Sequence, residues 1–482
     1  MNEIFQTIER FLESASEPVL LEAGEERLAI SAGNFALESG NGRLILQAWD
    51  ERRNLVRRVT GVERETRGKL VLGIERFGKR SGTIELIDRQ RPAGTNIDLR
   101  GARLEFRQRF HLFLRRQFPA YKVAELTTEA DLEHSLSPAY PRALVRQGAS
   151  AWAAIGSDAD HPDGVLTFGL IWLDYLRRRE PSLAIHGLVL YLPAGREKTT
   201  CLRLRFLDAA AAQSVVFVYG ENGVESPVDL LDYGNLETHL EPCSRRLPSG
   251  LDRILEPIQR LTEVNTIERA DGDLSLRVNG LEFARSAGGD LLFGIDRRRK
   301  MQPGRAGEIH SLASELTRLR TAGAPDPRNP LYLRNPEAWL ESVVRDHIEE
   351  IDARLLHAPI YGQVPAFAAI DRGVLDLLAI ENSGRLAVLE LKASEDIHLP
   401  LQALDYWMRV RWHLERDEFK ANGYFPGLEL CREPPRLLLV SPALDFHPTA
   451  ERILHYFSPD VPVERVGVGL QWRKELKVVW RS

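Results

Sequence analysis

The feature that most constrains this chain is a pair of short apolar segments that carry charged residues at matching positions. Val374–Ile380 reads VLDLLAI, and Leu386–Leu391 reads LAVLEL and is followed at once by Lys392. Between them lies Glu381–Arg385 (ENSGR), whose residue types are typical of a turn. Two apolar segments of this length around a short turn predict a buried antiparallel β-hairpin.

The turn determines which residues of the two strands face each other. If it is centred on Ser383, Asp376 lies opposite Glu390. Lys392 then shares the face of Glu390, because side chains alternate along a strand. Directly opposed residues in an antiparallel pair lie roughly 5 Å apart at Cβ. Two carboxylates and one ammonium are therefore expected to meet within an otherwise apolar sheet.

Charges in such a place need a partner. Like charges opposite each other destabilise a sheet, and buried charges are usually paired or bound to metal. Carboxylate oxygens suit Mg²⁺, and an ammonium beside them could orient water or stabilise charge on a phosphate. The alternative is a surface ion pair between Glu390 and Lys392, with Asp376 as a solvated residue near the turn. Apolar neighbours on both faces of the strands favour the first interpretation.

The spacing of Asp376 and Glu390–Lys392 (ELK) resembles the motif of the PD-(D/E)XK nuclease superfamily, which has the restriction-endonuclease-like fold. Leu375 stands where that motif has its proline. Downstream, Gln402 and Tyr406 are four residues apart, so they share one face of an expected helix. This Gln-x-x-x-Tyr pattern resembles the RecB-like and lambda-exonuclease-like branch of the superfamily.

The order of the expected elements also resembles the superfamily core. A helix at Pro336–Leu355 precedes a strand at Tyr361–Ala369, then come the hairpin, the Gln402 helix and a strand at Arg436–Val440. The resemblance therefore implies an α/β (α+β) chain with a restriction-endonuclease-like αβββαβ core at its C-terminal end.

The resemblance further implies a metal-dependent nuclease that hydrolyses phosphodiester bonds, expected to act on DNA. Its cofactor would be Mg²⁺ (or Mn²⁺), held by the two carboxylates of the hairpin, and the ammonium would position the attacking water. Whether such an enzyme cuts within strands or from their ends, and whether it prefers DNA to RNA, stays open at this point. The expected catalytic residues are the five that carry the motifs: Asp376, Glu390, Lys392, Gln402 and Tyr406.

Two further residues have expected roles and ordinary alternatives. Glu341, on the helix that opens the core, is a candidate metal ligand, with Glu337 as the second choice. A solvated helix face is the alternative for both. Arg409 lies near the Gln-x-x-x-Tyr face and is a candidate phosphate contact, with an ion pair to Glu415 or Asp417 as its alternative.

Composition limits the other functions. The net charge of −5 means that any DNA contact uses a local basic patch. There is no GxxxxGK[ST] loop and hence no expected nucleotide cofactor. No apolar segment is long enough for a membrane helix, and the N-terminus is acidic. Three scattered cysteines favour a reducing compartment, so we expect a cytoplasmic protein without membrane contact.

An internal repeat is also expected, with chance similarity between strand-rich segments with glycine turns as the alternative. When it is shifted by 246 residues, the segment LAISAGNFALESGNGRLILQAW matches LSLRVNGLEFARSAGGDLLFGI in part. Leu170–Tyr175 (LIWLDY) likewise resembles Leu401–Tyr406 (LQALDY), with Ile171 in place of Gln402. No Glu-x-Lys pattern on an apolar strand precedes the first of these, which indicates a degenerate nuclease-like copy. Such a copy could bind DNA, bind a partner, or only pack on the second half.

These patterns predict four domains in tandem duplication. They are a β-rich module at 1–95, a degenerate nuclease-like α/β domain at 96–240, a second β-rich module at 241–330 and the nuclease-like domain at 331–482. A helix is expected at Leu251–Leu261. The alternative to catalysis is a nucleic-acid-binding or regulatory scaffold that keeps this fold without turnover.

Overall fold

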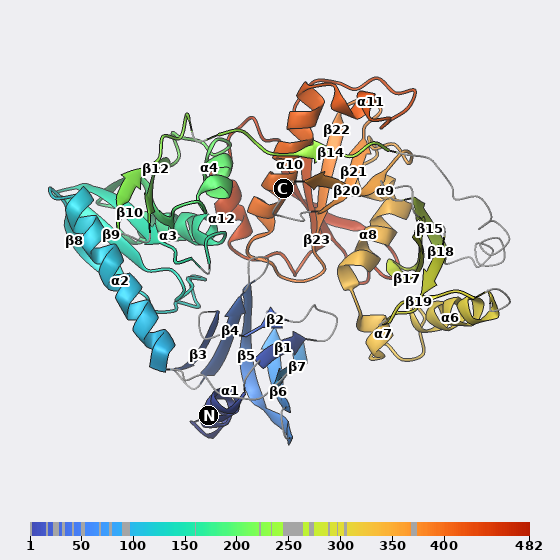
Figure 1. Ribbon diagram of the computed structural model, residues 1–482, viewed down its shortest axis with the longest axis horizontal. Coiled ribbons are helices and arrows are strands. Elements are labelled where there is room, and N and C mark those ends of the chain that lie inside the picture. Colours follow the sequence, from blue (N-terminus) through green and yellow to red (C-terminus); the bar gives the residue numbers. More distant parts are fainter. Residues whose placement is uncertain are drawn as a thin grey trace.

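The structure is a computed structural model, in which the strands form four sheets (Figure 1). It describes residues 2–15, 18–22, 28–30, 34–40, 43–49, 54–66, 69–76, 80–88, 97–159, 161–220, 223–232, 234–243, 264–268, 274–287, 290–295, 297–302, 306–367 and 374–482. The fold is a mixture of helices and sheets, as expected from the sequence. The helix expected at Leu251–Leu261 and the last two residues of the strand expected at Tyr361–Ala369 lie outside the described residues.

The first sheet belongs to the N-terminal β-rich segment. Helix α1 packs its apolar residues against an antiparallel sheet with the order β2-β1-β7-β6-β5-β4-β3. The elements are α1 (Asn2–Ser14), β1 (Pro18–Glu22), β2 (Leu28–Ala29), β3 (Phe35–Gly40), β4 (Arg43–Trp49), β5 (Asn54–Thr66), β6 (Lys69–Arg76) and β7 (Arg80–Asp88).

The second β-rich segment repeats the start of the first. Its sheet is an antiparallel meander covered by helix α6. Strand β15 occupies the residues of β1 shifted by 246, and β16, β17 and β18 begin within one residue of the shifted starts of β2, β3 and β4. The elements are β15 (Val264–Glu268), β16 (Leu274–Val278), β17 (Leu281–Ala287), β18 (Asp290–Phe293), β19 (Arg299–Lys300) and α6 (Ala306–Leu319).

The first α/β sheet follows the N-terminal segment. Its strand order is β13-β12-β11-β10-β9-β8, and only the β10–β11 and β11–β12 pairs are parallel. Helix α3 lies on it and contributes a nearly continuous buried face. The elements are α2 (Ile97–Gln117), β8 (Lys122–Thr127), β9 (Arg142–Gln147), β10 (Ser150–Gly156), α3 (Val165–Arg179), β11 (Ala184–Pro193), α4 (Lys198–Leu204), β12 (Gln213–Tyr219) and β13 (Glu225–Pro227).

The second α/β sheet has the order β14-β20-β21-β22-β23-β24-β25. Its first strand comes from the end of the first α/β segment, because β14 (His239–Leu240) pairs with β20. The remaining elements are α7 (Pro330–Leu333), α8 (Pro336–Asp346), α9 (Ile348–Ile351), β20 (Tyr361–Phe367), β21 (Val374–Ile380), β22 (Leu386–Leu391), α10 (Leu399–Glu415), α11 (Glu418–Ala421), β23 (Arg436–Pro442), α12 (Ala450–Leu454), β24 (Val463–Val468) and β25 (Val478–Arg481). Helix α8, strands β20 to β22, helix α10 and β23 follow each other in the α-β-β-β-α-β order expected from the sequence.

The two α/β sheets have the same topology. From β8 to β13 and from β20 to β25, consecutive pairs are antiparallel, antiparallel, parallel, parallel and antiparallel. A helix crosses over at the same places, since α3 corresponds to α10 and α4 to α12. This agreement supports the duplication that the sequence predicts.

One expected helix is divided. The sequence predicts a single helix at Pro336–Leu355, but His347 leaves the helical conformation between α8 and α9. Asp352 is extended, and its carboxylate accepts hydrogen bonds from Arg354 and Arg436. These hydrogen bonds hold the chain extended after Ile351, where the apolar periodicity alone would continue the helix to Leu355.

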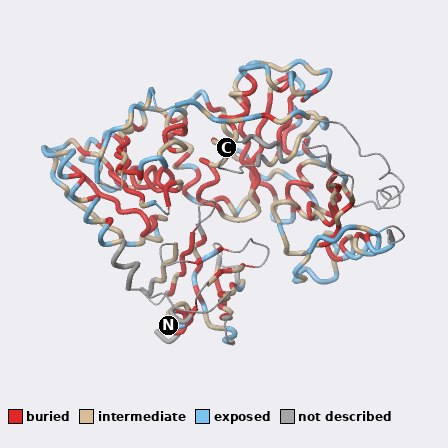
Figure 2. Tube along the Cα trace, viewed as in Figure 1, coloured by how far each residue is buried: buried red, intermediate tan, exposed pale blue. Residues whose placement is uncertain are grey.

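Buried residues run through both α/β halves (Figure 2), and one apolar cluster contains residues of each half. Leu170 and Leu188 of the first half belong to the same apolar cluster as Leu404 and Leu437 of the second. A separate cluster lies on the other face of the second sheet, beneath α8. No helix in the described part of the chain combines the length and the apolar character needed to span a bilayer.

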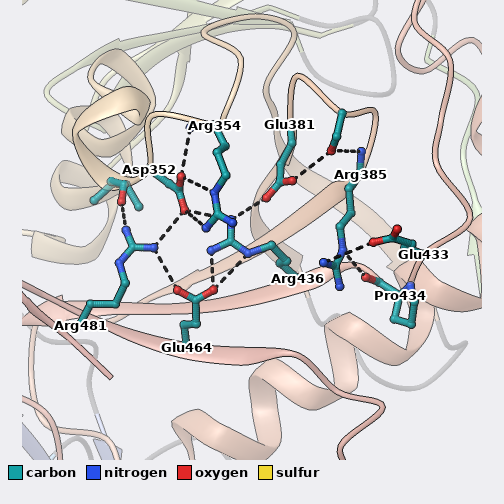
Figure 3. A network of polar contacts seen from close by, with 11 residues as sticks. Asp352, Arg354, Glu381, Arg385, Glu433, Pro434, Arg436, Glu464 and Arg481 are labelled. Atoms are coloured by element: carbon teal, nitrogen blue, oxygen red, sulfur yellow. Dashed lines mark hydrogen bonds and ion pairs between the residues drawn. The ribbon is translucent and has the colours of Figure 1, made fainter.

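A network of arginines and carboxylates lies at the turn end of the hairpin (Figure 3). The buried Arg436 donates to Asp352 at 2.9 Å and to Glu381 at 2.6 Å. It also donates to Glu464 at 3.1 Å. Burial alone would raise the pKa of Asp352, but hydrogen bonds from Arg354, Arg481 and Arg436 hold it well below its usual range. The network joins α9, the hairpin turn, β23 and β24.

Replacing Arg436 by Leu is expected to destabilise this end of the sheet by roughly 3–5 kcal/mol near neutral pH, because it leaves buried carboxylates without their cation. The deficit should shrink as the pH falls below about 4, where an unfolded Asp takes up a proton and the low pKa of Asp352 stops contributing. Hydrogen exchange of the β21 and β22 amides measures it. Arg432→Leu is the control, since Arg432 pairs with Asp417 on the surface. Equal effects of both variants would contradict the prediction.

Candidate active site

The hairpin has the register that the sequence predicts. Leu377 pairs with Leu389 and Leu378 with Val388. Asp376 is the next residue outward on β21, opposite Glu390 on β22. The backbone N–H of Leu391 donates to Asp376 Oδ2 at 2.8 Å. The two carboxylates therefore lie on neighbouring strands at the end of the hairpin away from the turn.

The Glu390 carboxylate is buried and incompletely bonded. The residue is 3% exposed, and its Oε2 atom has no hydrogen-bond partner among the described residues. An ionised carboxylate in such a place costs free energy unless a cation or a donor reaches it. Burial, together with the nearby Asp376 charge, raises the pKa of Glu390 well above its usual value.

Burial also disfavours the ionised form of Asp376, but less strongly than that of Glu390. Burial raises the pKa of Asp376 to about 7, although the Lys392 ammonium acts in the opposite direction. The charge of Glu341 also raises this pKa. The two facing carboxylates therefore resist being ionised together unless a further positive charge joins them.

Lys392 is a half-buried cation surrounded by carboxylates. Its Nζ atom lies 3.5 Å from Asp396 Oδ2 and 3.9 Å from Glu337 Oε1. Burial lowers the pKa of Lys392, but Glu337, Asp396, Glu390 and Asp376 outweigh it and raise this pKa well above its usual value. The side chain is therefore an ammonium at neutral pH.

Sequence reasoning missed Asp396. The residue is 5% exposed and lies in the loop between β22 and α10, four residues after Lys392. Its Oδ1 atom also accepts a hydrogen bond from the His398 backbone N–H at 2.8 Å. An acidic residue at this spacing in a loop has no pattern of its own, so only the folded loop shows that it contacts the lysine.

The acidic residues of α8 differ in their surroundings. Glu341 is buried, and its Oε1 atom accepts from Arg345 at 2.6 Å. Its Oε2 atom lies 3.9 Å from Arg277 of β16. Glu337 is more exposed and is the one within reach of Lys392. The metal role of either residue stays a prediction. A metal ion bound by Glu341 would have to displace Arg345 or Arg277 from its carboxylate.

Helix α10 brings three expected residues toward the sheet. Tyr406 is half-buried on this helix, and burial followed by the charges of Glu390 and Asp376 raises its pKa. Gln402 lies one turn earlier on the same helix, beside the loop of Asp396. Arg409 is 8% exposed and donates to the Asp405 carbonyl at 3.2 Å, so its phosphate contact stays a prediction.

The donor set fits a magnesium or manganese ion. In the described ranges, no group of three or more His, Cys, Asp or Glu residues is arranged to hold a metal. Asp376 and Glu390 are a two-carboxylate set, and Mg²⁺ is commonly held by one or two carboxylates together with water and substrate phosphates. The unpartnered Oε2 atom of Glu390 is the observation that fits such an ion.

Comparisons with known proteins leave the family open. No protein-family model matches the chain. No curated protein matches it either. A solved structure described as EndoMS in its apo form is 13% identical, covering 41% of this chain and 87% of that one, with a TM-score of 0.14. A likeness this weak supports no conclusion about fold or function.

Replacing Asp376 by Asn is expected to stabilise the metal-free protein above neutral pH. The folded carboxyl keeps its proton up to about pH 7, whereas an unfolded Asp loses it near pH 4. Between these values the folded state binds more protons, so stability falls as the pH rises. The variant should lack this fall and exceed the wild type by roughly 1–3 kcal/mol near pH 8. Hydrogen exchange of the β22 amides in chelator measures it.

The exposed Asp460 provides the matched control. Asp460→Asn removes the same charge from the surface and should leave the pH dependence of the wild type unchanged. A wild-type protein whose β22 amides are equally protected at about pH 5 and about pH 8 would show that Asp376 carries no burial penalty.

Proposed function

We propose that this chain is a metal-dependent nuclease of the PD-(D/E)XK type that hydrolyses phosphodiester bonds in DNA. The observation that carries the proposal is the facing pair Asp376 and Glu390, with an unpartnered buried oxygen, beside a protonated Lys392. Asp376 is partly buried and Glu390 is buried, and two facing carboxylates that resist being ionised together are explained if a divalent cation binds between them. The α-β-β-β-α-β order and the Gln-x-x-x-Tyr helix support the same assignment.

In this proposal Asp376 and Glu390 hold Mg²⁺ (or Mn²⁺). The bound ion supplies Lewis-acid activation of the phosphoryl group and lowers the pKa of a coordinated water. Hydrolysis would add one water to phosphorus and break the bond to the leaving sugar oxygen, which takes up a proton. The products are a phosphate monoester and a free hydroxyl, and no redox step is involved.

The protein's own residues complete the site. Lys392 acts as a fixed cation that stabilises charge developing on the phosphate, since its raised pKa makes it a poor base. Asp396 holds the ammonium in place as a positioning residue. Gln402 and Tyr406 provide polar groups from α10 that brace the site or contact the substrate strand.

Lys392→Ala is expected to lower the cleavage rate about 10²–10³-fold, because it removes a charge aimed at the transition state. Asp376→Asn should abolish cleavage by removing a metal ligand. The assay follows linear, circular single-stranded and supercoiled DNA with Mg²⁺ or Mn²⁺. Lys420→Ala is the matched control, because this exposed lysine lies on α11. Cutting of the circular substrates identifies internal cleavage.

Two outcomes would count against the proposal. Cleavage that persists in Lys392→Ala and Asp376→Asn at the wild-type rate would come from a contaminant or from another site. A wild type that binds metal but cuts none of the substrates would favour the non-catalytic scaffold.

A further inference from the structure

The two α/β halves contact each other reciprocally. Asp405 on α10 accepts two hydrogen bonds from Arg203 on α4, at 2.9 and 2.7 Å. In the opposite direction, Arg452 of α12 lies 3.7 Å from Asp174 of α3. Asp174 and Asp405 occupy the same place in the LIWLDY and LQALDY segments. In each half, an aspartate at the same position of the helix therefore faces an arginine of the other half.

A pair of backbone hydrogen bonds marks the centre of this contact. The N–H of Asp208 donates to the Tyr456 carbonyl, and the N–H of Ser458 donates to the Phe206 carbonyl, both at 2.8 Å. Leu207 and Phe457 form the antiparallel bridge between them. These residues follow α4 and α12, the corresponding helices of the two halves. Reciprocal contacts of this kind are those of an isologous two-fold interface, here within one chain.

The strand registers identify the residues of the first half that correspond to the candidate active site. The N–H of Lys392 donates to the Val440 carbonyl beyond the Leu391–Val440 pair. The N–H of Ser157 donates in the same way to the Tyr191 carbonyl beyond the Gly156–Tyr191 pair. Ser157 therefore corresponds to Lys392, and the residue two positions before it corresponds to Glu390.

That residue is Ile155, and its partner on the neighbouring strand is Arg142. Arg142 thus occupies the place of Asp376. In the first half, the guanidinium of Arg142 therefore stands in place of one carboxylate and the apolar side chain of Ile155 in place of the other. The hydroxyl of Ser157 stands in place of the ammonium. Nothing in this set can hold a divalent cation.

Arg142 is built into the first half. It is 4% exposed, and its Nη2 atom donates to the Glu129 carbonyl at 2.6 Å. Its guanidinium carbon lies 5.5 Å from the centre of the Trp172 ring. A buried positive charge at this place repels a metal ion where the second half has two carboxylates to attract one.

We infer that the chain works as a pseudo-dimer with one competent site and one silent site, and that it nicks one strand of duplex DNA in each binding event. This rests on the proposed nuclease function. A two-fold protein matches the two strands of a duplex, one site to each strand. Here one of the two positions holds Arg142, so one phosphodiester bond is hydrolysed by one water and the opposite strand stays intact.

The test uses supercoiled plasmid in excess over protein with Mg²⁺. Open-circular DNA should accumulate first, and linear DNA should follow only as independent nicks build up. Linear DNA as the first product would overturn the inference while leaving the nuclease function standing. A protein that cuts no substrate refutes the proposed function, and the inference falls with it. A protein that cuts only single strands also overturns the inference.

A second measurement does not depend on activity. Titration with Mn²⁺, followed by electron paramagnetic resonance, should show bound metal in the wild type and none in Asp376→Asn. The control is Asp158→Asn, which removes the acidic residue next to Ser157 in the silent half and should bind as the wild type does. If Asp376→Asn keeps half of the bound Mn²⁺, or if Asp158→Asn loses half, the first half holds metal and the inference is wrong.

Discussion

The desolvation of two facing carboxylates is the constraint on which the second α/β half depends. Asp376 and Glu390 are directly opposed on neighbouring strands, and Glu390 is almost fully buried. Their mutual repulsion opposes folding of the sheet that carries them. Lys392 offsets part of this cost, and Glu337 and Asp396 in turn keep Lys392 charged. Lys392 thus stabilises the carboxylates of the hairpin, and further carboxylates stabilise Lys392.

An ion-pair network at the opposite end of the same strands stabilises the hairpin against this repulsion. There Arg436 joins Asp352, Glu381 and Glu464, and these three carboxylates are balanced by three arginines because Arg354 and Arg481 also take part. The fully paired network fixes the hairpin turn, while the strand ends that carry Asp376 and Glu390 bear the unpaired charge. The stabilising network and the candidate active site thus lie at different ends of one hairpin.

Sequence patterns predicted much of this and missed three features for physical reasons. The hairpin register follows from the turn around Ser383, because one turn fixes every opposed pair. Asp396 was missed because its contact with Lys392 depends on how a loop folds. Arg142 was missed because an arginine on an apolar strand has no motif, and its position is defined only by hydrogen bonds to a neighbouring strand. The break at His347 was hidden because Ile348 and Ile351 continue the apolar period.

The joining of both halves in one polypeptide has a genetic consequence. In a homodimer, one codon specifies the same residue in both sites, so a change that silences one silences both. Here Arg142 and Asp376 are encoded separately, and each half can vary without altering the other. The shared core and the Leu207–Phe457 bridge keep the silent half in place as a partner. If the proposed function holds, its surface is therefore free to change under selection that does not act on the candidate active site.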